Sequence, residues 1–167
     1  RPARLPIYEH IISPTIMEQI LGVPFAALEA GDDPSTGSGR DLDEFFRHYC
    51  RFWPEMTYDT VSYEVCITEI LPGHGAIMGG KGPIQDRADF ERYPWAELEA
   101  RYWALAEPRF DALRRHLPSG MKALGGVGNG VLEISEDLVG FESLAYVQAA
   151  IDTVVVSTQH TPEVTNE

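Results

Sequence analysis

The chain has 167 residues, and its composition, 44% hydrophobic and 23% charged, is typical of a globular domain large enough to form a core. This composition excludes a disordered segment. The formal net charge of −13 at pH 7 argues against nucleic acid or an anionic membrane surface as the main partner, because both attract positive charge.

The two cysteines, Cys50 and Cys66, form no CxxC motif, so the sequence indicates neither a disulfide scaffold nor a zinc ribbon. The longest apolar runs are far shorter than a membrane span, and no charged start followed by an apolar core marks a secretory signal. We therefore expect a cytoplasmic protein. Because the chain begins at Arg1 and not at methionine, we also expect it to be part of a longer protein.

The first predicted elements are a short strand and a helix. β-Favouring side chains in residues 4–11 predict the strand. Ser13 followed by Pro14 is a typical helix start, with serine as the N-cap and proline in the first turn, and Gly22 is a typical helix end. Residues 29–40 are rich in glycine, serine, aspartate and proline, which predicts a loop.

A strongly amphipathic helix and a second strand follow. In residues 41–56, apolar and aromatic side chains recur at three- and four-residue intervals, as a helix that faces the core requires. Residues 58–67 carry the β-branched and aromatic side chains that are typical of a strand. Glycines at five positions between residues 73 and 82 predict a loop after this strand.

The remaining elements are helices on either side of a third strand. Residues 86–117 predict two helices separated by Pro94, and Pro108 is expected to kink or divide the second of them. Residues 121–127 predict a short buried strand, and residues 130–150 predict one or two further helices. The alternation indicates an α/β protein with a parallel sheet and crossover helices, either about half of an eight-unit barrel or a small open sheet.

Long stretches of the chain resemble the uroporphyrinogen decarboxylase-like family. These stretches are PIYEH (6–10), YCRFWPEMTYDTVSYE (49–64), GPIQDRADFERYPW (82–95) and GGVGNGVLEISEDLVGFESLAY (125–146). The family folds as a (β/α)8 TIM barrel and includes corrinoid-dependent methyltransferases. The resemblance therefore implies that residues 1–150 form the N-terminal part of such a barrel, about half of it, with parallel strands and crossover helices.

Two positions depart from the true decarboxylases. These enzymes place an arginine in a Gln-Ala-Gly-Arg stretch after their first strand, where this chain reads Tyr8-Glu9-His10. Their catalytic aspartate, in a Phe-Ser-Asp stretch at the end of the second strand, is matched by Glu64 in VSYE, a carboxylate one methylene longer. Both departures argue against uroporphyrinogen itself as the substrate and favour either an uncharacterised branch of the family or the methyltransferase-like branch.

The tail, residues 151–167, does not continue this pattern. It is similar to a short stretch from the central region of S-adenosylmethionine synthetases, which carry a closely related Val-Val-Ser-Thr-Gln-His run. So short a stretch brings none of the synthetase nucleotide site with it. We interpret the tail as a segment of different origin, either a chimeric junction or a family-specific extension.

In a barrel, the active site lies at the carboxyl ends of the strands, which makes Glu64 and His10 the candidate catalytic residues. A desolvated carboxylate at Glu64 can exchange protons near neutral pH, or hold pyrrole N–H donors, and the alternative is a glutamate in a surface salt bridge. His10 can titrate near neutral pH or bind a metal, and the alternative is a structural hydrogen bond. Glu9 is a candidate substrate ligand, although neighbours on one strand point to opposite sides, so only one of Glu9 and His10 is expected at the mouth.

Glycines cluster between residues 125 and 130, at the predicted junction of the third strand and its helix. They permit either an anion bound by backbone N–H groups or close packing of the crossover. Gly128 and Asn129 are candidate substrate-binding residues, because asparagine tolerates a left-handed backbone and offers both a donor and an acceptor. Glu133 either leans toward the substrate or stabilises the start of the helix through its dipole.

The resemblance implies a small-molecule substrate, either a tetrapyrrole or a methylated corrinoid, and a carboxy-lyase or methyltransferase activity. Zinc and a corrinoid belong to the methyltransferase branch, and we expect no metal and no cofactor in this chain. His48 and Cys50 cannot chelate one ion, because residues two apart on a helix diverge by about 200°. The alternative is an inactive fragment that binds a partner or forms homo-oligomers through exposed strand edges.

Overall fold

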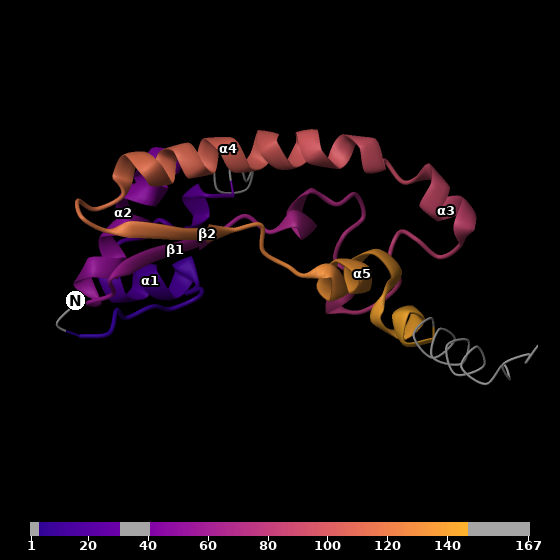
Figure 1. The fold of residues 1–167 in the computed structure, drawn as a ribbon, viewed down its shortest axis with the longest axis horizontal. Helices are drawn as coiled ribbons and strands as arrows, with labels where there is room; N and C mark the ends of the chain where they lie inside the picture. Colours follow the sequence, from indigo (N-terminus) through magenta and orange to yellow (C-terminus); the bar gives the residue numbers. More distant parts are fainter. Residues whose placement is uncertain (1–3, 31–40, 147–167) are drawn as a thin grey trace, which may run out of the picture. The chain divides into compact units, whose positions relative to one another are not determined.

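The computed structural model describes residues 4–30 and 41–146, which divide into two compact units (Figure 1). The first unit comprises Arg1–Val65 and Glu99–Val127, and the second comprises Cys66–Leu98 and Gly128–Glu167. Most of the predicted loop at 29–40, and all of the tail at 151–167, lie outside the described residues. The helices, strands and buried side chains of the two units are therefore described separately.

Helix α1 (Pro14–Leu21) opens the first unit as the sequence predicts. Ser13 precedes the helix, Pro14 stands in its first turn, and Gly22 ends it in the left-handed conformation with φ +67°. A short 3₁₀ turn, Ala26–Leu28, follows. Ser13 occupies the N-cap position, but its side chain makes no capping hydrogen bond, so the predictable boundaries reflect the proline and the left-handed glycine.

Helix α2 (Leu42–Glu55) supplies most of the core of the first unit, as its periodicity predicts. Its N-cap Asp41 accepts a hydrogen bond from the backbone N–H of Glu44 at 2.9 Å. One face of the helix is buried through its aromatic side chains, namely Phe45, Phe46, Tyr49, Phe52 and Trp53. This aromatic face packs on the sheet, where the ring of Tyr63 lies 4.8 Å from that of Phe46 in an edge-to-face arrangement.

The sheet of the first unit has two parallel strands, β1 (Thr60–Glu64) and β2 (Lys122–Gly126). Their register pairs Thr60 with Lys122 and Glu64 with Gly126. Helix α4 (Leu98–His116) runs beside the strand pair in Figure 1, and the ring of Phe110 on this helix packs 6.0 Å from that of Tyr63. The helix continues through Pro108, so this proline does not divide it.

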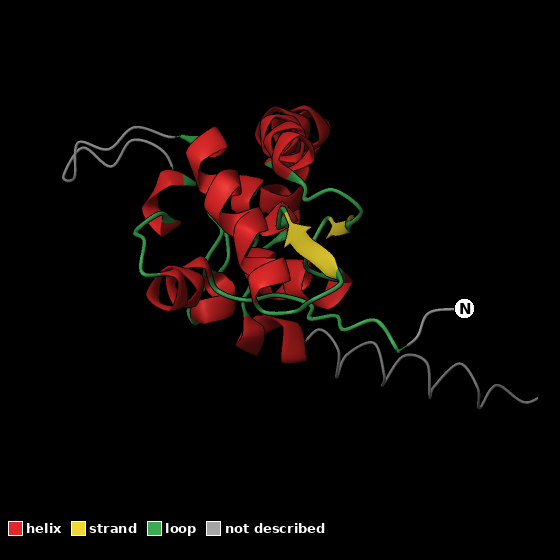
Figure 2. Ribbon diagram, turned by 90° about the vertical axis from the view of Figure 1, so that its left-hand side faces the viewer, coloured by secondary structure: helices red, strands yellow, loops and turns green. Residues whose placement is uncertain are grey.

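The predicted partial TIM barrel is wrong. Figure 2 shows one small sheet among helices and loops, and in the described part of the chain only β1 and β2 pair. The predicted strand at 4–11 is an irregular extended segment that meets the chain around Asp59 through the Asp59 N–H to Ile7 carbonyl bond. The backbone N–H of Ile7 donates to the Asp59 carboxylate at 2.6 Å, so the second bond of this contact goes to a side chain and not to the backbone of a partner strand.

Strand β2 also differs from its prediction. We expected a buried strand, but the side-chain positions from Lys122 to Gly125 are exposed, and Leu124 keeps 46% of its surface accessible. Strand β1, in contrast, is buried at Val61, Ser62 and Tyr63. A short apolar run predicts a strand but does not reveal whether other elements cover both of its faces.

The second unit contains short helices around a small core. In chain order these are the 3₁₀ turns Ile67–Ile70 and Ala76–Met78, helix α3 (Arg87–Arg92), the 3₁₀ turn Trp95–Glu97, helix α5 (Val131–Val139) and a helical stretch at 141–146. Its buried core residues are Leu71, Ile84, Tyr93 and Leu138. Asp137 is fully buried and accepts hydrogen bonds from the backbone N–H groups of Gly75 and Ile77, which fixes the glycine-rich loop against α5.

Candidate functional site

Glu64 is the last residue of β1, at the carboxyl edge of the parallel strand pair. Its side chain keeps 20% of its surface exposed, and its Oε2 atom lies 3.6 Å from Nε2 of His10. That separation is within ion-pair range but longer than a hydrogen bond. The first unit therefore brings two of the predicted site residues, a carboxylate and an imidazole, together at one edge of the sheet.

His10 lies on the irregular segment before α1, and its ring contacts a second side chain. The hydroxyl oxygen of Tyr8 is 3.1 Å from Nδ1 of His10, so the two ring nitrogens face different partners. Glu9 points elsewhere, because its carboxylate accepts the backbone N–H of His10 at 3.0 Å. Residues two apart in an extended segment share a side, and this spacing is the signal that could have identified Tyr8.

Gly126 is paired with Glu64 across the sheet, and its missing side chain makes room for the carboxylate. A Cβ atom placed on Gly126 would lie 2.9 Å from Oε1 of Glu64, closer than such atoms approach in proteins. At the neighbouring Gly125, a Cβ atom would meet only ordinary contacts at 3.4 Å. Sequence analysis did not single out Gly126 as a neighbour of Glu64, because strand register is a tertiary property.

The other predicted substrate-binding residues lie in the second unit. Gly128 and Asn129 are both in the left-handed region, with φ of +58° and +55°, and Asn129 Oδ1 accepts a hydrogen bond from the Thr68 hydroxyl at 2.8 Å. The carboxylate of Glu133 accepts the backbone N–H of Gly130 at 2.9 Å. Glu133 thus satisfies a donor at the start of α5, where a negative charge is favoured by the helix dipole.

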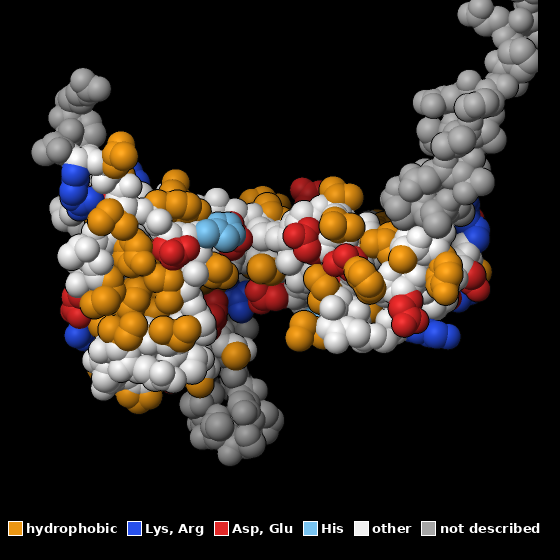
Figure 3. Space-filling model, turned by 90° about the horizontal axis from the view of Figure 1, so that it is seen from below, with side chains coloured by type: hydrophobic (Ala, Val, Ile, Leu, Met, Phe, Trp, Pro, Cys, Tyr) orange, Lys and Arg blue, Asp and Glu red, His pale blue; other side chains and the backbone are white. Residues whose placement is uncertain are grey.

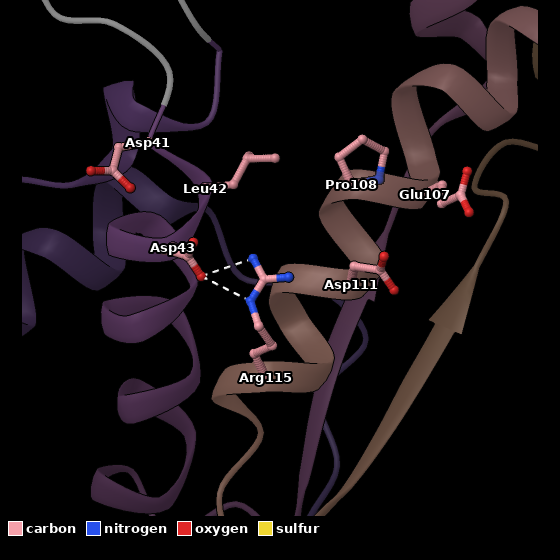
Figure 4. A pocket seen from close by; sticks show the side chains of 7 residues that line it. All are labelled: Asp41, Leu42, Asp43, Glu107, Pro108, Asp111 and Arg115. Carbon is pink, nitrogen blue, oxygen red and sulfur yellow. Dashed lines mark hydrogen bonds and ion pairs between the residues drawn. The ribbon is translucent and has the colours of Figure 1, made fainter.

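A pocket of the first unit lies between the start of α2 and the middle of α4 (Figure 4). Its lining residues are Asp41, Leu42, Asp43, Glu107, Pro108, Asp111 and Arg115. Asp43 Oδ1 accepts hydrogen bonds from Arg115 at 2.9 Å and from His116 at 3.0 Å. These bonds lower the pKa of the Asp43 carboxyl, and the bond from Arg115 has the larger effect. The lining is mostly acidic, so this pocket is unsuited to a substrate that carries several carboxylates.

The described residues do not fit a metal centre. Within residues 4–30 and 41–146, no group of three His, Cys, Asp or Glu side chains is placed to share an ion. His48 instead lies 3.0 Å from the Glu44 carboxylate through Nε2. Cys50 is buried, and burial raises the pKa of its thiol to about 12, which disfavours the thiolate that zinc requires.

No family model, no curated protein and no solved structure matches the chain. The resemblance to the uroporphyrinogen decarboxylase-like family accordingly depends on the sequence stretches quoted for it.

Proposed function

We propose that the chain provides part of the catalytic site of a cytoplasmic enzyme of the uroporphyrinogen decarboxylase-like type, with a tetrapyrrole or a methylated corrinoid as substrate. The observation that carries this proposal is the position of Glu64 at the carboxyl end of β1, 3.6 Å from His10. Ligands of sheets with parallel strands bind outside the carboxyl ends of the strands. The resemblance aligns Glu64 with the catalytic carboxylate of the family.

A tetrapyrrole offers groups that this pair can recognise. Pyrrole N–H groups are hydrogen-bond donors, and an ionised carboxylate such as that of Glu64 is an acceptor. Decarboxylation of a pyrrole acetate develops positive charge on the ring, and a fixed carboxylate beside the ring stabilises that charge. His10 supplies an imidazole beside the carboxylate, with one nitrogen that can donate a hydrogen bond and one that can accept it.

The methyl-transfer branch of the proposal differs in its requirement for zinc. Because the described residues do not fit a zinc site, we assign no step to zinc. For a methylated corrinoid, which is itself a tetrapyrrole derivative, the assigned role of Glu64 and His10 is limited to binding and orienting the macrocycle. Both substrate classes therefore place a four-ring macrocycle beside the same carboxylate.

Substitution of Glu64 tests the proposal. The chain is titrated separately with uroporphyrinogen, under exclusion of oxygen, and with methylcobalamin. Binding is followed by isothermal titration calorimetry, and release of CO₂ is measured. The proposal predicts that one macrocycle binds and that Glu64→Gln loses at least tenfold in affinity, or about 10²–10⁴-fold in rate where turnover occurs. The matched control is Glu55→Gln, which neutralises an exposed carboxylate of the first unit that pairs with Arg51 on α2. Equal behaviour of the two variants, or no binding of either macrocycle, would refute the proposal.

A second candidate function is self-association without catalysis, and a specific observation favours it. Figure 3 shows hydrophobic side chains gathered on one face of the unit that holds α1. Exposed large hydrophobic residues between positions 5 and 20 are Leu5, Ile7, Tyr8, Ile11, Ile16 and Ile20. Exposed apolar surface of this kind, together with an exposed β2, is typical of surfaces that another chain covers.

Sedimentation velocity distinguishes the two candidates. Self-association predicts a dimer or larger species that Ile16→Lys combined with Ile20→Lys on α1 shifts to the monomer. Both isoleucines are more than half exposed, at 51% and 53%, so the double variant should fold normally by circular dichroism. A compact monomer that binds or turns over a macrocycle would exclude self-association as the function.

A further inference from the structure

Tyr8, His10 and Glu64 form a chain of three polar groups in the first unit. The Tyr8 hydroxyl lies 3.1 Å from Nδ1 of His10, and Nε2 on the other side of the ring lies 3.6 Å from Oε2 of Glu64. Each ring nitrogen therefore has one partner. A further carboxylate, that of Glu9, contacts His10 only at its backbone N–H.

The two partners favour the same tautomer of a neutral imidazole. A carboxylate only accepts hydrogen bonds, so Glu64 favours hydrogen on the nitrogen that faces it, Nε2. A tyrosine hydroxyl can donate, so Tyr8 is matched to an Nδ1 atom without hydrogen. The tautomer with hydrogen on Nε2 satisfies both contacts at once, whereas the other tautomer sets the Nε2 lone pair against a negative charge.

We propose that Tyr8 is a positioning residue, whose hydroxyl donates to Nδ1 of His10 and so directs the Nε2 hydrogen toward Glu64. Donation to Nδ1 fixes both the tautomer and the orientation of the ring. The Nε2 hydrogen then faces Oε2 of Glu64 at the 3.6 Å separation of the two atoms, while Oε1 lies on the side of Gly126. The role in a reaction depends on the proposed function, but the tautomer is a property of the free chain.

Nuclear magnetic resonance of the histidine rings tests this inference without a ligand. The chain is labelled with ¹⁵N in histidine, and long-range ¹H–¹⁵N correlations are recorded where His10 is neutral. The expected spectrum shows hydrogen on Nε2 and a hydrogen-bonded acceptor at Nδ1. In Tyr8→Phe, the Nδ1 resonance should shift to that of an unbonded acceptor and the minor tautomer should increase. The other histidines serve as internal references.

The matched control is Tyr146→Phe, which removes an exposed hydroxyl from the second unit, since Tyr146 keeps 78% of its surface accessible. It should leave the His10 resonances unchanged. Hydrogen on Nδ1 in the unsubstituted chain, or identical His10 resonances in Tyr8→Phe, would overturn the assignment of Tyr8. The resonance experiment needs no macrocycle, so its result does not depend on the binding assay with Glu64→Gln. A failure of the Tyr8 inference can therefore be distinguished from a failure of the proposed function.

Discussion

Substitution of Gly126 by alanine gives the most direct test of the geometry around Glu64. A Cβ atom at this position would lie 2.9 Å from Oε1, 3.4 Å from Cδ and 3.6 Å from Cγ of Glu64. All of these contacts are with one flexible side chain and none with backbone. We therefore expect Gly126→Ala to fold, with the Glu64 side chain forced away from its present position.

The size of the effect follows from two opposing contributions. Replacing glycine by alanine where the backbone is unstrained stabilises by about 0.4–1 kcal/mol, because the unfolded chain loses freedom. Holding a side chain away from its preferred rotamer costs about 0.5–1.5 kcal/mol. Gly125→Ala, which meets only ordinary contacts with Phe110 and Tyr63, should show the first contribution alone. Gly126→Ala should be less stable than Gly125→Ala by about 0.5–1.5 kcal/mol.

Urea denaturation followed by circular dichroism measures this difference, provided that the slopes of the transitions agree. Repeating both substitutions in a Glu64→Ala background removes the clash, so Gly126→Ala should then resemble Gly125→Ala. The two backgrounds should differ by a coupling of about 0.5–1.5 kcal/mol between positions 64 and 126. A coupling below about 0.3 kcal/mol, the level of simple additivity, would refute the close approach of Glu64 to Gly126.

Three further predictions concern other parts of the chain. Gly82→Ala should lower the free energy of unfolding by about 1–3 kcal/mol, measured by urea denaturation, because its Cβ atom would lie 2.1 Å from the backbone oxygen of Leu138, which cannot move aside easily. Cys50 should resist alkylation at pH 8 in the folded chain and react after denaturation, as mass spectrometry can show, because burial raises the pKa of its thiol to about 12. A hydrogen bond from the backbone N–H of Ile7, and secondly one from the Arg4 side chain, lower the pKa of the Asp59 carboxyl. The ionised carboxylate therefore stabilises the folded chain above the ordinary aspartate pKa of about 3.9, and this stabilisation is lost as the pH falls through the lowered pKa of the folded state. Hydrogen exchange at Ile7, corrected for the intrinsic effect of pH, should lose its protection in that acidic range and keep it at neutral pH.

The helices of the first unit could be predicted because their signals are local. The Ser13–Pro14 start and the Gly22 end determine α1, and the aromatic period of residues 41–56 determines α2. The partial barrel was wrong because strand count is not local. Whether a β-favouring segment joins a sheet depends on a partner elsewhere in the chain, and in the described chain the backbone of residues 4–11 meets that of β1's neighbourhood through one bond, from the Asp59 N–H to the Ile7 carbonyl.

The candidate site was predictable to a similar extent. Glu64 was predicted from its place at the end of the second predicted strand, and His10 from its place after the first predicted strand. In the structure their side chains lie 3.6 Å apart. Gly126 and Tyr8 were missed, because the first requires the register of β1 against β2 and the second requires the ring orientation of His10. The register is a tertiary property that no spacing in a single sequence contains, whereas the two-residue spacing between Tyr8 and His10 was a local signal for Tyr8.

The glycine cluster near residue 128 can now be interpreted through carboxylates that belong to the chain itself. In the first unit Gly126 accommodates Glu64, and in the second unit a Cβ atom on Gly130 would lie 2.8 Å from Oε2 of Glu133. A bound phosphate would have to displace the Glu133 carboxylate from the N–H of Gly130, against the repulsion between two anions. In the first unit, the carboxylate of Glu64 beside Gly126 instead favours ligands that donate hydrogen bonds. This preference is the physical reason to test a macrocycle with N–H groups before any phosphorylated compound.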